Sequence, residues 1–394
     1  MNKNKIRKLA ITRGFFPNLG TSLVGLAKEL LLDNERFDVL NYNLKGKFNI
    51  TYKNIPGYPH KYCFLHELVG SEKIIPTGKC SGITWENIKE TYGYLTSFAK
   101  NKNYEKIVAR STHIHCYINP TTYKMHNPDV KLRVIISDPI RTKSKKDNID
   151  PDFLDKVNRY AKEKYDLPPI KSDTCLFYLA EYMIYLFANE IVFTNEYQHK
   201  YMVDMFPIKN IQEIIKDRVV IAYHPTLPKK YYDIVKSNYV LDSSKINLGY
   251  FGQLYPFKWM KTFFVAFSRL DKSVQEKYKI HIFTNSKMVI KGKNEVMKIK
   301  DYVITNGMKH FMECLNLMTK MDYLLIDDSP SPNGHKYNPC IPSKLSDYLG
   351  SERPIFALCE KDSVMSKKQL DIMVNVNDIN GIKNELEKIA LKVK

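Results

Sequence analysis

Short apolar runs rich in β-branched residues alternate with segments of helical periodicity along most of the chain. The first pair is KLAITRGFF at 8–16, which predicts a strand, and TSLVGLAKELLLD at 21–33, whose apolar positions fall on one helical face. Strand followed by helix, repeated in this way, predicts a mostly parallel α/β sheet. In the first half of the chain, further strands are predicted at 37–44, 106–111, 132–139, 190–195 and 218–225, with a helix at 86–101.

The same alternation starts again near residue 246 and predicts a second α/β domain. Its strands are predicted at 246–254, 278–284, 300–305, 322–328 and 371–376, its helices at 260–270 and 309–321, and a helix and a strand within 342–358. We therefore expect a first domain at 1–223, a linker at 224–245, a second domain at 246–375 and, at 376–394, a helix that packs back on the first domain. Clefts between domains are favoured ligand sites, so the site is expected where the two domains face each other.

One segment of the first half departs from the alternation. Residues 142–173 are charged and interrupted by prolines, as in KSKKDNIDPD and DLPPIKSD. We expect an excursion above the sheet, which is either a mobile cover or a solvated surface loop.

The chain is strongly basic, with 61 Lys and Arg against 42 Asp and Glu among 394 residues, a formal charge of +19. Such a charge favours partners that carry phosphate: nucleic acid, an anionic membrane face, a nucleotide or an anionic polymer. The basic residues are scattered, without an Arg-rich arm or zinc-finger spacing, so specific nucleic-acid binding is disfavoured. The chain is also rich in Lys, Asn, Ile and Tyr, which is typical of AT-rich genomes, so the charge alone does not decide between these partners.

The seven cysteines are widely spaced and none forms a C-x-x-C pair. This argues against a zinc site and against a disulfide framework, and it indicates a reducing compartment. The opening MNKNKIRKLAITRGFF lacks the apolar run of a signal peptide, and no stretch approaches about 20 uninterrupted apolar residues. We expect a cytoplasmic protein, with peripheral contact at the cytoplasmic face of the inner membrane.

The stretch PSKLSDYLGSERPIFAL at 342–358 combines hydroxyls, a cation and an acid at a predicted helix start. Ser343 is placed to cap this helix, Lys344 to reach a phosphate, and Asp347 to accept hydrogen bonds from two ribose hydroxyls. The alternative is structural: Ser343 is only a cap, and Asp347 only complements the helix dipole.

Two loops between a strand and a helix are candidates for binding phosphate. GYFGQLYPFKWM places Gly252 and Lys258 in such a loop, where a cation and helical N–H groups favour a diphosphate. GFFPNLG places Asn18 and Gly20 after the first strand, as a phosphate or sugar loop. Neither loop contains GxGxxG or GxxxxGK[ST], so neither dinucleotide nor P-loop recognition is supported. For Lys258, a plain surface position is the competing interpretation.

Polar side chains also follow two other strands of the first half. Arg110 lies at the end of the strand at 106–111 and His113 and His115 follow it, while Asp138 and Arg141 lie at the C-terminal end of the strand at 132–139. In α/β folds, ligand contacts gather at the carboxyl ends of strands. His-x-His is a weak metal motif, and a structural role is the commoner one for a histidine on an apolar face.

With these residues in place, the whole chain resembles the GT-B glycosyltransferases, close to the family 4-type enzymes that make bacterial surface polysaccharides. The resemblance rests on an ordered series of segments and is strongest in PSKLSDYLG-x-x-RPI, which is similar to the family's P-x-K-x-x-E-Y-L-A-x-G-x-P segment. It implies two Rossmann-like domains that face each other across a cleft. The segments of the series are RS…H, VKLRVIISDP, FTNEYQ, YHPTLP, GQLYPFK, DYLLIDDS and PSKLSDYLGSERPIFAL.

The resemblance also implies roles by position. Asp347 matches the acid that holds the nucleotide ribose, and Lys258 matches the cation that offsets the donor diphosphate. Ser343 and Lys344 lie near that diphosphate. The Gly20 loop faces the donor phosphate and the acceptor. His113 or His115 lies where such enzymes keep a histidine near the reacting sugar.

Three positions depart from the family pattern. Gln253 stands where many members have Arg, which weakens the expected cationic pair. Pro339 stands where the first acid of the E-x7-E pattern is expected, and Asp347 is itself shorter than Glu. The contact to the donor sugar is therefore not assigned, and SPSPNGHKYNPC at 329–340 is a candidate to supply it.

The chemistry implied is transfer of a sugar from a nucleoside diphosphate sugar, with UDP favoured over GDP, to a hydroxyl of a glycan or lipid-linked glycan. The family is usually retaining, and the resemblance implies a donor held without a metal; the acids of IDD at 326–328 are adjacent and do not form a DxD motif. Two alternatives stay open: a nucleotide-sugar epimerase of the same fold, which needs no acceptor, and a non-catalytic basic protein that binds polyanions or nucleic acid. The epimerase predicts conversion of a single sugar nucleotide, and the binder predicts steep dependence on salt.

Overall fold

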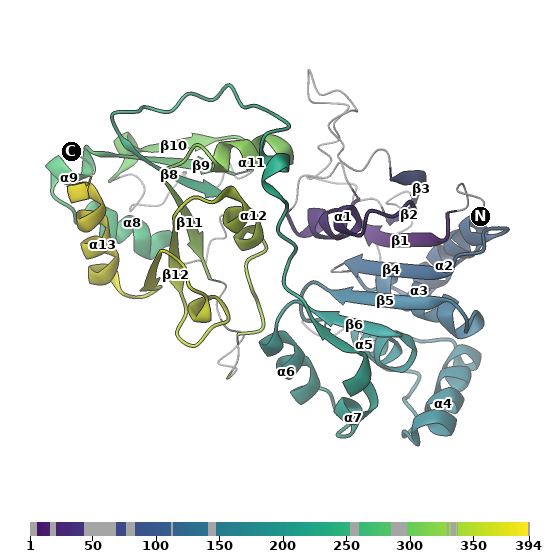
Figure 1. Cartoon of the computed structure of the whole chain (residues 1–394). Helices are drawn as coiled ribbons and strands as arrows, with labels where there is room; N and C mark the ends of the chain where they lie inside the picture. The colour runs from purple at the N-terminus through teal and green to yellow at the C-terminus, as the bar shows by residue number, and fades with distance from the viewer. Residues whose placement is uncertain are drawn as a thin grey trace. The chain divides into compact units, whose positions relative to one another are not determined.

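A computed structural model of the chain describes residues 6–15, 21–42, 68–75, 83–111, 113–140, 147–252, 260–284, 298–328, 331, 336 and 338–392. The chain divides into two compact units between Tyr223 and His224 (Figure 1). Each unit is built on its own parallel sheet flanked by helices.

The first unit contains a seven-stranded sheet, counted over the described residues, with the order β3-β2-β1-β4-β5-β6-β7. All neighbouring strands are parallel, and most strand residues are buried because helices cover both faces of such sheets. The strands are β1 (Lys8–Arg13), β2 (Phe37–Tyr42), β3 (Val69–Ile75), β4 (Lys106–Ser111), β5 (Lys131–Ile136), β6 (Glu190–Phe193) and β7 (Val219–Ile221).

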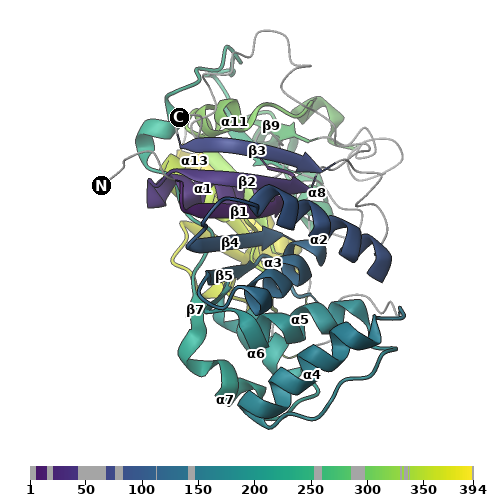
Figure 2. The same cartoon turned by 90° about the vertical axis from the view of Figure 1, so that its right-hand side faces the viewer.

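Helices α2, α3 and α5 lie together on one face of this sheet (Figure 2). The helix α5 is apolar except for Glu181 and is buried almost throughout, as expected for a helix inside a core. The helices of the first unit are α1 (Thr21–Asp33), α2 (Trp85–Ala99), α3 (His115–His126), α4 (Pro151–Tyr165), α5 (Leu176–Phe187), α6 (Glu196–Asp204) and α7 (Ile211–Ile215).

Much of the segment expected to be an irregular excursion is the helix α4. Asp150 caps it, with Oδ1 accepting from the N–H groups of Asp152 at 3.0 Å and Phe153 at 3.4 Å, and Pro151 occupies the first turn. Proline is favoured there because its missing N–H has no helical partner to lose. Pro151 therefore marks the start of a helix rather than an interruption. The expectation of a surface loop was wrong for residues 151–165.

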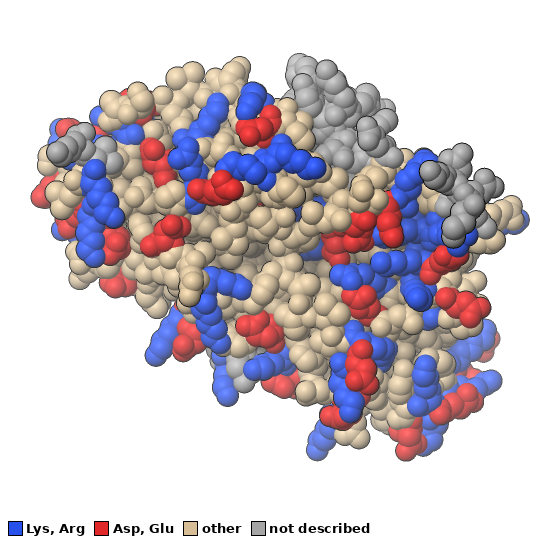
Figure 3. Space-filling view, viewed as in Figure 1, with Lys and Arg blue, Asp and Glu red and all other residues tan. Residues whose placement is uncertain are grey.

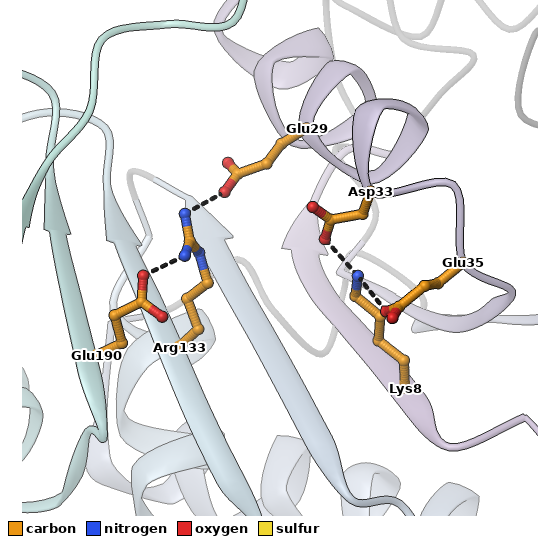
Figure 4. A network of polar contacts seen from close by, with 6 residues as sticks. All are labelled: Lys8, Glu29, Asp33, Glu35, Arg133 and Glu190. Carbon is orange, nitrogen blue, oxygen red and sulfur yellow. Dashed lines mark hydrogen bonds and ion pairs between the residues drawn. The ribbon is translucent and has the colours of Figure 1, made fainter.

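Two ionic clusters tie α1 and the turn after it to the sheet (Figure 4). The ammonium of Lys8, on β1, lies 2.5 Å from Asp33 Oδ2 and 3.2 Å from Glu35 Oε2. In the other cluster, the guanidinium of Arg133, on β5, pairs with Glu29 Oε1 at 2.7 Å and with Glu190. The helix that follows the Gly20 loop is thus anchored to two strands by charge as well as by packing.

The second unit contains a six-stranded parallel sheet, again over the described residues, with the order β10-β9-β8-β11-β12-β13. Its strands are β8 (Ile246–Phe251), β9 (Tyr278–Phe283), β10 (Val303–Asn306), β11 (Tyr323–Asp327), β12 (Ile355–Cys359) and β13 (Ile372–Asn375). Its helices are α8 (Met260–Ser268), α9 (Lys272–Gln275), α11 (Phe311–Met318), α12 (Lys344–Ser351) and α13 (Ile379–Lys392).

The terminal helix α13 lies beside α8 (Figure 1). Its buried residues Ile382, Leu386 and Ile389 belong to the core of the second unit, which also contains Phe263 of α8. The apolar face of this helix is thus used within its own unit, and the expectation that the helix also packs back on the first domain stays a prediction. Residues 224–245, expected to be a linker, also belong to the second unit.

Candidate functional site

The second sheet has a topological switch point between β8 and β11. From β8 the chain proceeds outward to β9 and β10, and from β11 it proceeds in the opposite direction to β12 and β13. Open parallel sheets bind ligands outside the carboxyl ends of the strands at such a point, because the connecting helices diverge there. The topology alone therefore locates a candidate site at the ends of β8 and β11.

Lys344 and Gly252 meet at this point. Gly252 follows β8 with φ of +128°, a conformation that L side chains rarely adopt, and its N–H donates to Phe283 O at 2.9 Å. A Cβ on Gly252 would lie 3.9 Å from the Lys344 ammonium. Lys344 is the first residue of α12, so cation, glycine backbone and helix start lie together, as expected for a phosphate site.

Two residues that sequence reasoning did not assign hold Lys344 in place. Its ammonium lies 3.3 Å from Asp327 Oδ1 and 3.7 Å from the ring centroid of Tyr250. The Tyr250 hydroxyl also donates to Asp327 Oδ1 at 3.2 Å. Asp327 ends β11 and Tyr250 lies on β8, so the two strands of the switch point fix the lysine between them.

Asp347 lies in the first turn of α12 and is 1% exposed. Its backbone carbonyl accepts a hydrogen bond from the Tyr232 hydroxyl at 2.6 Å. Burial, together with charges that include Asp347, raises the pKa of the Cys314 thiol to about 12. The neighbouring Tyr348 hydroxyl accepts from the N–H of Phe251 at 2.9 Å and so joins α12 to the end of β8.

Ser343 precedes α12 but makes no side-chain capping hydrogen bond to it. Its backbone is already helical, with φ of −61° and ψ of −27°, whereas a capping side chain needs an extended backbone to reach back to the helix. The interpretation of Ser343 as a simple cap was therefore wrong. Its carbonyl accepts from the Ser346 hydroxyl at 2.9 Å.

The segment that follows the domain boundary is packed on α12. In a short 3₁₀ helix at Lys229–Tyr232, Tyr232 is fully buried, and its carbonyl accepts from Asn316 Nδ2 at 3.0 Å. The Lys229 ammonium donates to Ser351 O at 3.3 Å. With the bond from the Tyr232 hydroxyl to Asp347, these contacts fix the helix that carries the candidate residues.

A second acidic group, Asp328, follows Asp327 in the chain. Asp328 is fully buried, and its Oδ2 accepts from the Ser363 hydroxyl at 2.5 Å and from the N–H of Glu360 at 3.0 Å. Burial raises the pKa of the Asp328 carboxyl to about 7, against the opposing effect of these hydrogen bonds. Glu360 Oε2 accepts from Ser331 Oγ and Asn338 Nδ2, each at 2.7 Å, and so holds two described residues of the 329–340 segment.

The first sheet has its own switch point, between β1 and β4. Arg110 lies at the end of β4 and is 3% exposed. Its Nε donates to Ser137 Oγ at 3.1 Å, and its Nη1 lies 3.7 Å from Glu29 Oε2. Burial lowers the pKa of Arg110, and the charge of Glu29 opposes this shift. Gly25 leaves room for the guanidinium, because a Cβ there would lie 2.6 Å from Arg110 Nη2.

His113 and His115 form a pair at the start of α3. Their Nδ1 atoms are 2.7 Å apart and their rings are stacked, with centroids 4.5 Å apart. One of the two Nδ1 atoms must therefore carry the proton that the other accepts. Burial, and to a lesser degree the charge of Arg13, lowers the pKa of His115 to about 4, so His115 is neutral at pH 7.

Of the remaining candidate residues, the structure describes only Asp138. Asp138 lies after β5 and is exposed. Asn18, Gly20, Arg141 and Lys258 lie outside the described residues, as does Gln253. Among the described residues, no group of three or more His, Cys, Asp and Glu side chains is placed to hold a metal ion. No helix within those ranges is both long and apolar enough to cross a membrane.

Basic and acidic side chains are interspersed on the face of the molecule shown in Figure 3. This agrees with the scattered basic residues of the sequence. On this face, no single area gathers Lys and Arg apart from Asp and Glu among the described residues.

No protein-family model matches the sequence, and no curated protein matches it. Solved structures do match the fold. HepE of Anabaena in complex with UDP matches with a TM-score of 0.56 and 10% identity over 99% of this chain and 91% of that chain. A glycosyltransferase from Rickettsia africae matches with a TM-score of 0.57 and 10% identity over 99% and 89%. A putative UDP-N-acetylglucosamine 2-epimerase from Listeria monocytogenes matches with a TM-score of 0.51 and 9% identity over 98% and 88%.

These matches extend along nearly the whole of each chain, and they establish the fold class. The chain has two Rossmann-like α/β domains of the GT-B type, as the sequence predicted. At this level of identity, fold similarity does not by itself define an activity.

Proposed function

We propose that the chain is a glycosyltransferase that moves a sugar from a nucleoside diphosphate sugar to a hydroxyl of a glycan or lipid-linked glycan. The observation that carries this proposal is the position of Lys344. Its ammonium lies near Gly252 at the switch point of the second sheet, and Asp347 lies one turn further along the same helix. Cation, glycine backbone and acid in this order suit the diphosphate and ribose of a donor nucleotide.

In this proposal the second domain binds the donor. Lys344, the N–H groups at the start of α12 and the backbone at Gly252 stabilise the negative charge that develops on the leaving diphosphate. Lys258 would add a second cation from the loop after β8, and Ser343 a hydroxyl. Asp347 would accept hydrogen bonds from the ribose. The base is proposed to be uracil, which is supported by the UDP named in the structure of HepE.

The first domain would supply the acceptor side. We assign His113, His115 and Arg110 to the reacting sugar by their positions near the end of β4. We assign Asn18, Asp138 and Arg141 to the acceptor, and Gly20 to the donor diphosphate. Since His115 is neutral at pH 7, an uncharged imidazole would face the reacting sugar. We further propose retention of configuration, a donor held without a metal, and a role in capsule or surface polysaccharide synthesis. That role would place the protein at the cytoplasmic face of the membrane.

The test is release of nucleotide from a panel of UDP- and GDP-sugars, measured with and without a mixture of glycan and lipid-linked acceptors. We expect release of UDP that depends on the acceptor. Conversion of a single UDP-sugar into its epimer without any acceptor would instead support the epimerase, whose fold is represented among the structural matches. If no nucleotide sugar is consumed, and the protein instead binds nucleic acid with steep dependence on salt, the proposal is wrong.

A further inference from the structure

The cation at the proposed diphosphate site is paired with a buried carboxylate. Lys344 lies 3.3 Å from Asp327 Oδ1, and the carboxylate is 1% exposed while the lysine side chain is 13% exposed. The pair is therefore an ion pair largely removed from solvent, and it carries no net charge. An arriving diphosphate meets a neutralised ammonium rather than an open one.

Tyr250 fixes the geometry of the Lys344–Asp327 pair. Its ring lies under the Lys344 ammonium, with the centroid at 3.7 Å, and its hydroxyl donates to the same carboxylate oxygen at 3.2 Å. One fully buried side chain thus contacts both members of the pair. Cation–π contact and hydrogen bond together restrict the lysine to one position at the end of β8.

Apart from Lys344 and Tyr250, few described groups hold the Asp327 carboxylate. Its other oxygen, Oδ2, is buried and has no hydrogen-bond partner among the described residues. Burying a carboxylate with half of its acceptor capacity unmet is unfavourable, and a buried ion pair adds little net stability even when complete. The pair is therefore poorly explained by stability alone, and a role at the ligand site explains it better.

The distance between Asp327 and a phosphate bound to Lys344 determines how strongly Asp327 affects diphosphate binding. A phosphate oxygen that accepts from Lys344 lies within about 6 Å of Asp327, since an ammonium–phosphate hydrogen bond adds about 2.8 Å to the observed 3.3 Å. This is less than the Debye length of about 8 Å in physiological salt, so the repulsion is only weakly screened. A like charge at 4–6 Å shifts equilibria tenfold or more.

We propose that Asp327 is a counter-ion that orients Lys344 and at the same time limits how tightly the site holds the nucleoside diphosphate product. This inference rests on the proposed function. Binding that is equally strong in the ground state, the transition state and the product does not accelerate the reaction, and it slows release of the leaving nucleotide. Asp327 is thus a positioning residue that acts on the diphosphate through Lys344.

The test is Asp327→Asn, which keeps an oxygen acceptor for Tyr250 and Lys344 but removes the charge. Calorimetric titration with UDP should show about tenfold tighter binding than the wild type. Titration with uridine, which lacks phosphate, should be unchanged. The gain should shrink in a Lys344→Gln background, because the lysine no longer holds the diphosphate close to the carboxylate. The matched control is Asp371→Asn, an exposed acid that accepts from the N–H of Ile355 at the other end of β12; its affinity for UDP should equal that of the wild type.

The outcomes separate the two proposals. If the wild type does not bind UDP, the proposed function in its UDP form is wrong. If the wild type binds UDP but Asp327→Asn binds it equally or more weakly, Asp327 is only structural and the inference is overturned. Should Asp327→Asn not fold, as judged by its thermal transition, Asp327→Ser removes the same charge with a smaller side chain and is subject to the same two outcomes.

Discussion

Replacing Lys344 by Gln is expected to lower kcat/KM for the nucleotide-sugar donor about 100- to 1,000-fold, the range found when one charge-stabilising donor is removed from an active site. The reason is the position of the ammonium at the end of β8, near Gly252. Lys388→Ala is the matched control, because Lys388 is an exposed lysine of the same domain paired with Glu385 at 2.7 Å. Its activity should equal that of the wild type in a steady-state assay of UDP release.

Loss of Lys344 also has a structural cost that must be separated from its chemistry. Lys344→Gln leaves Asp327 buried without its cation, which costs about 3 kcal/mol of folding stability. The double variant Asp327→Asn/Lys344→Gln removes both charges and should regain most of that stability. It should remain as inactive as Lys344→Gln. If the double variant regains activity together with stability, Lys344 serves the fold and not the donor.

The second large effect is expected from Gly350→Ala in α12. A Cβ at this position would lie 2.2 Å from the Tyr232 hydroxyl oxygen and 3.0 Å from the carbonyl of Leu227. The Tyr232 side chain is fully buried and its hydroxyl is bonded to Asp347 O, so it has little freedom to move away. We expect a loss of about 2 kcal/mol, typical of overpacking, and a fall of roughly 4–8 °C in the Tm of the second domain by calorimetry.

Gly93→Ala is the matched control for this change. Gly93 is also inside a helix, α2, but a Cβ there would meet nothing within 4 Å. Alanine is the better helix former, so this variant should be more stable by about 0.5–1 kcal/mol. Two identical substitutions in helices are thus expected to have opposite signs. If both variants are more stable than the wild type, the Tyr232 hydroxyl does not lie as close to Gly350 as the structure places it.

The sequence predicted the parts of the fold that have a strong local signal. The helix at 21–33 and the strand at 106–111 have the predicted bounds, because alternating apolar runs and helical faces are local properties. Where the local signal was weak, prediction failed. The helix α3 buries polar residues, among them Asn119 and Thr121, and carries Pro120 in its interior, so its sequence lacks the apolar stripe that marks an amphipathic helix. The helix α4 did have a signal, Asp-Pro-Asp at its start, which was interpreted as an interruption.

The candidate site was predictable only in part, for a related reason. Lys344 and Asp347 lie on one helical turn, so a single short motif revealed them. Tyr250 and Asp327, which hold Lys344, are 77 positions apart in the chain and meet only because β8 and β11 are neighbours in the sheet. That adjacency is a property of topology, which a local pattern does not encode. The one available signal was an acid at the end of a predicted strand, Asp327 in the run IDD.

We propose that the switch point of the second sheet binds the nucleoside diphosphate of a sugar donor. The most direct measurement is amide hydrogen exchange of the wild-type protein with and without saturating UDP. We predict slower exchange with UDP across α12 (Lys344–Ser351) and at Gly252, and unchanged exchange in α13 (Ile379–Lys392), which lies in the same domain beside α8. Unchanged exchange across α12 under saturating UDP, or protection confined to other segments, would show that UDP does not bind at this switch point.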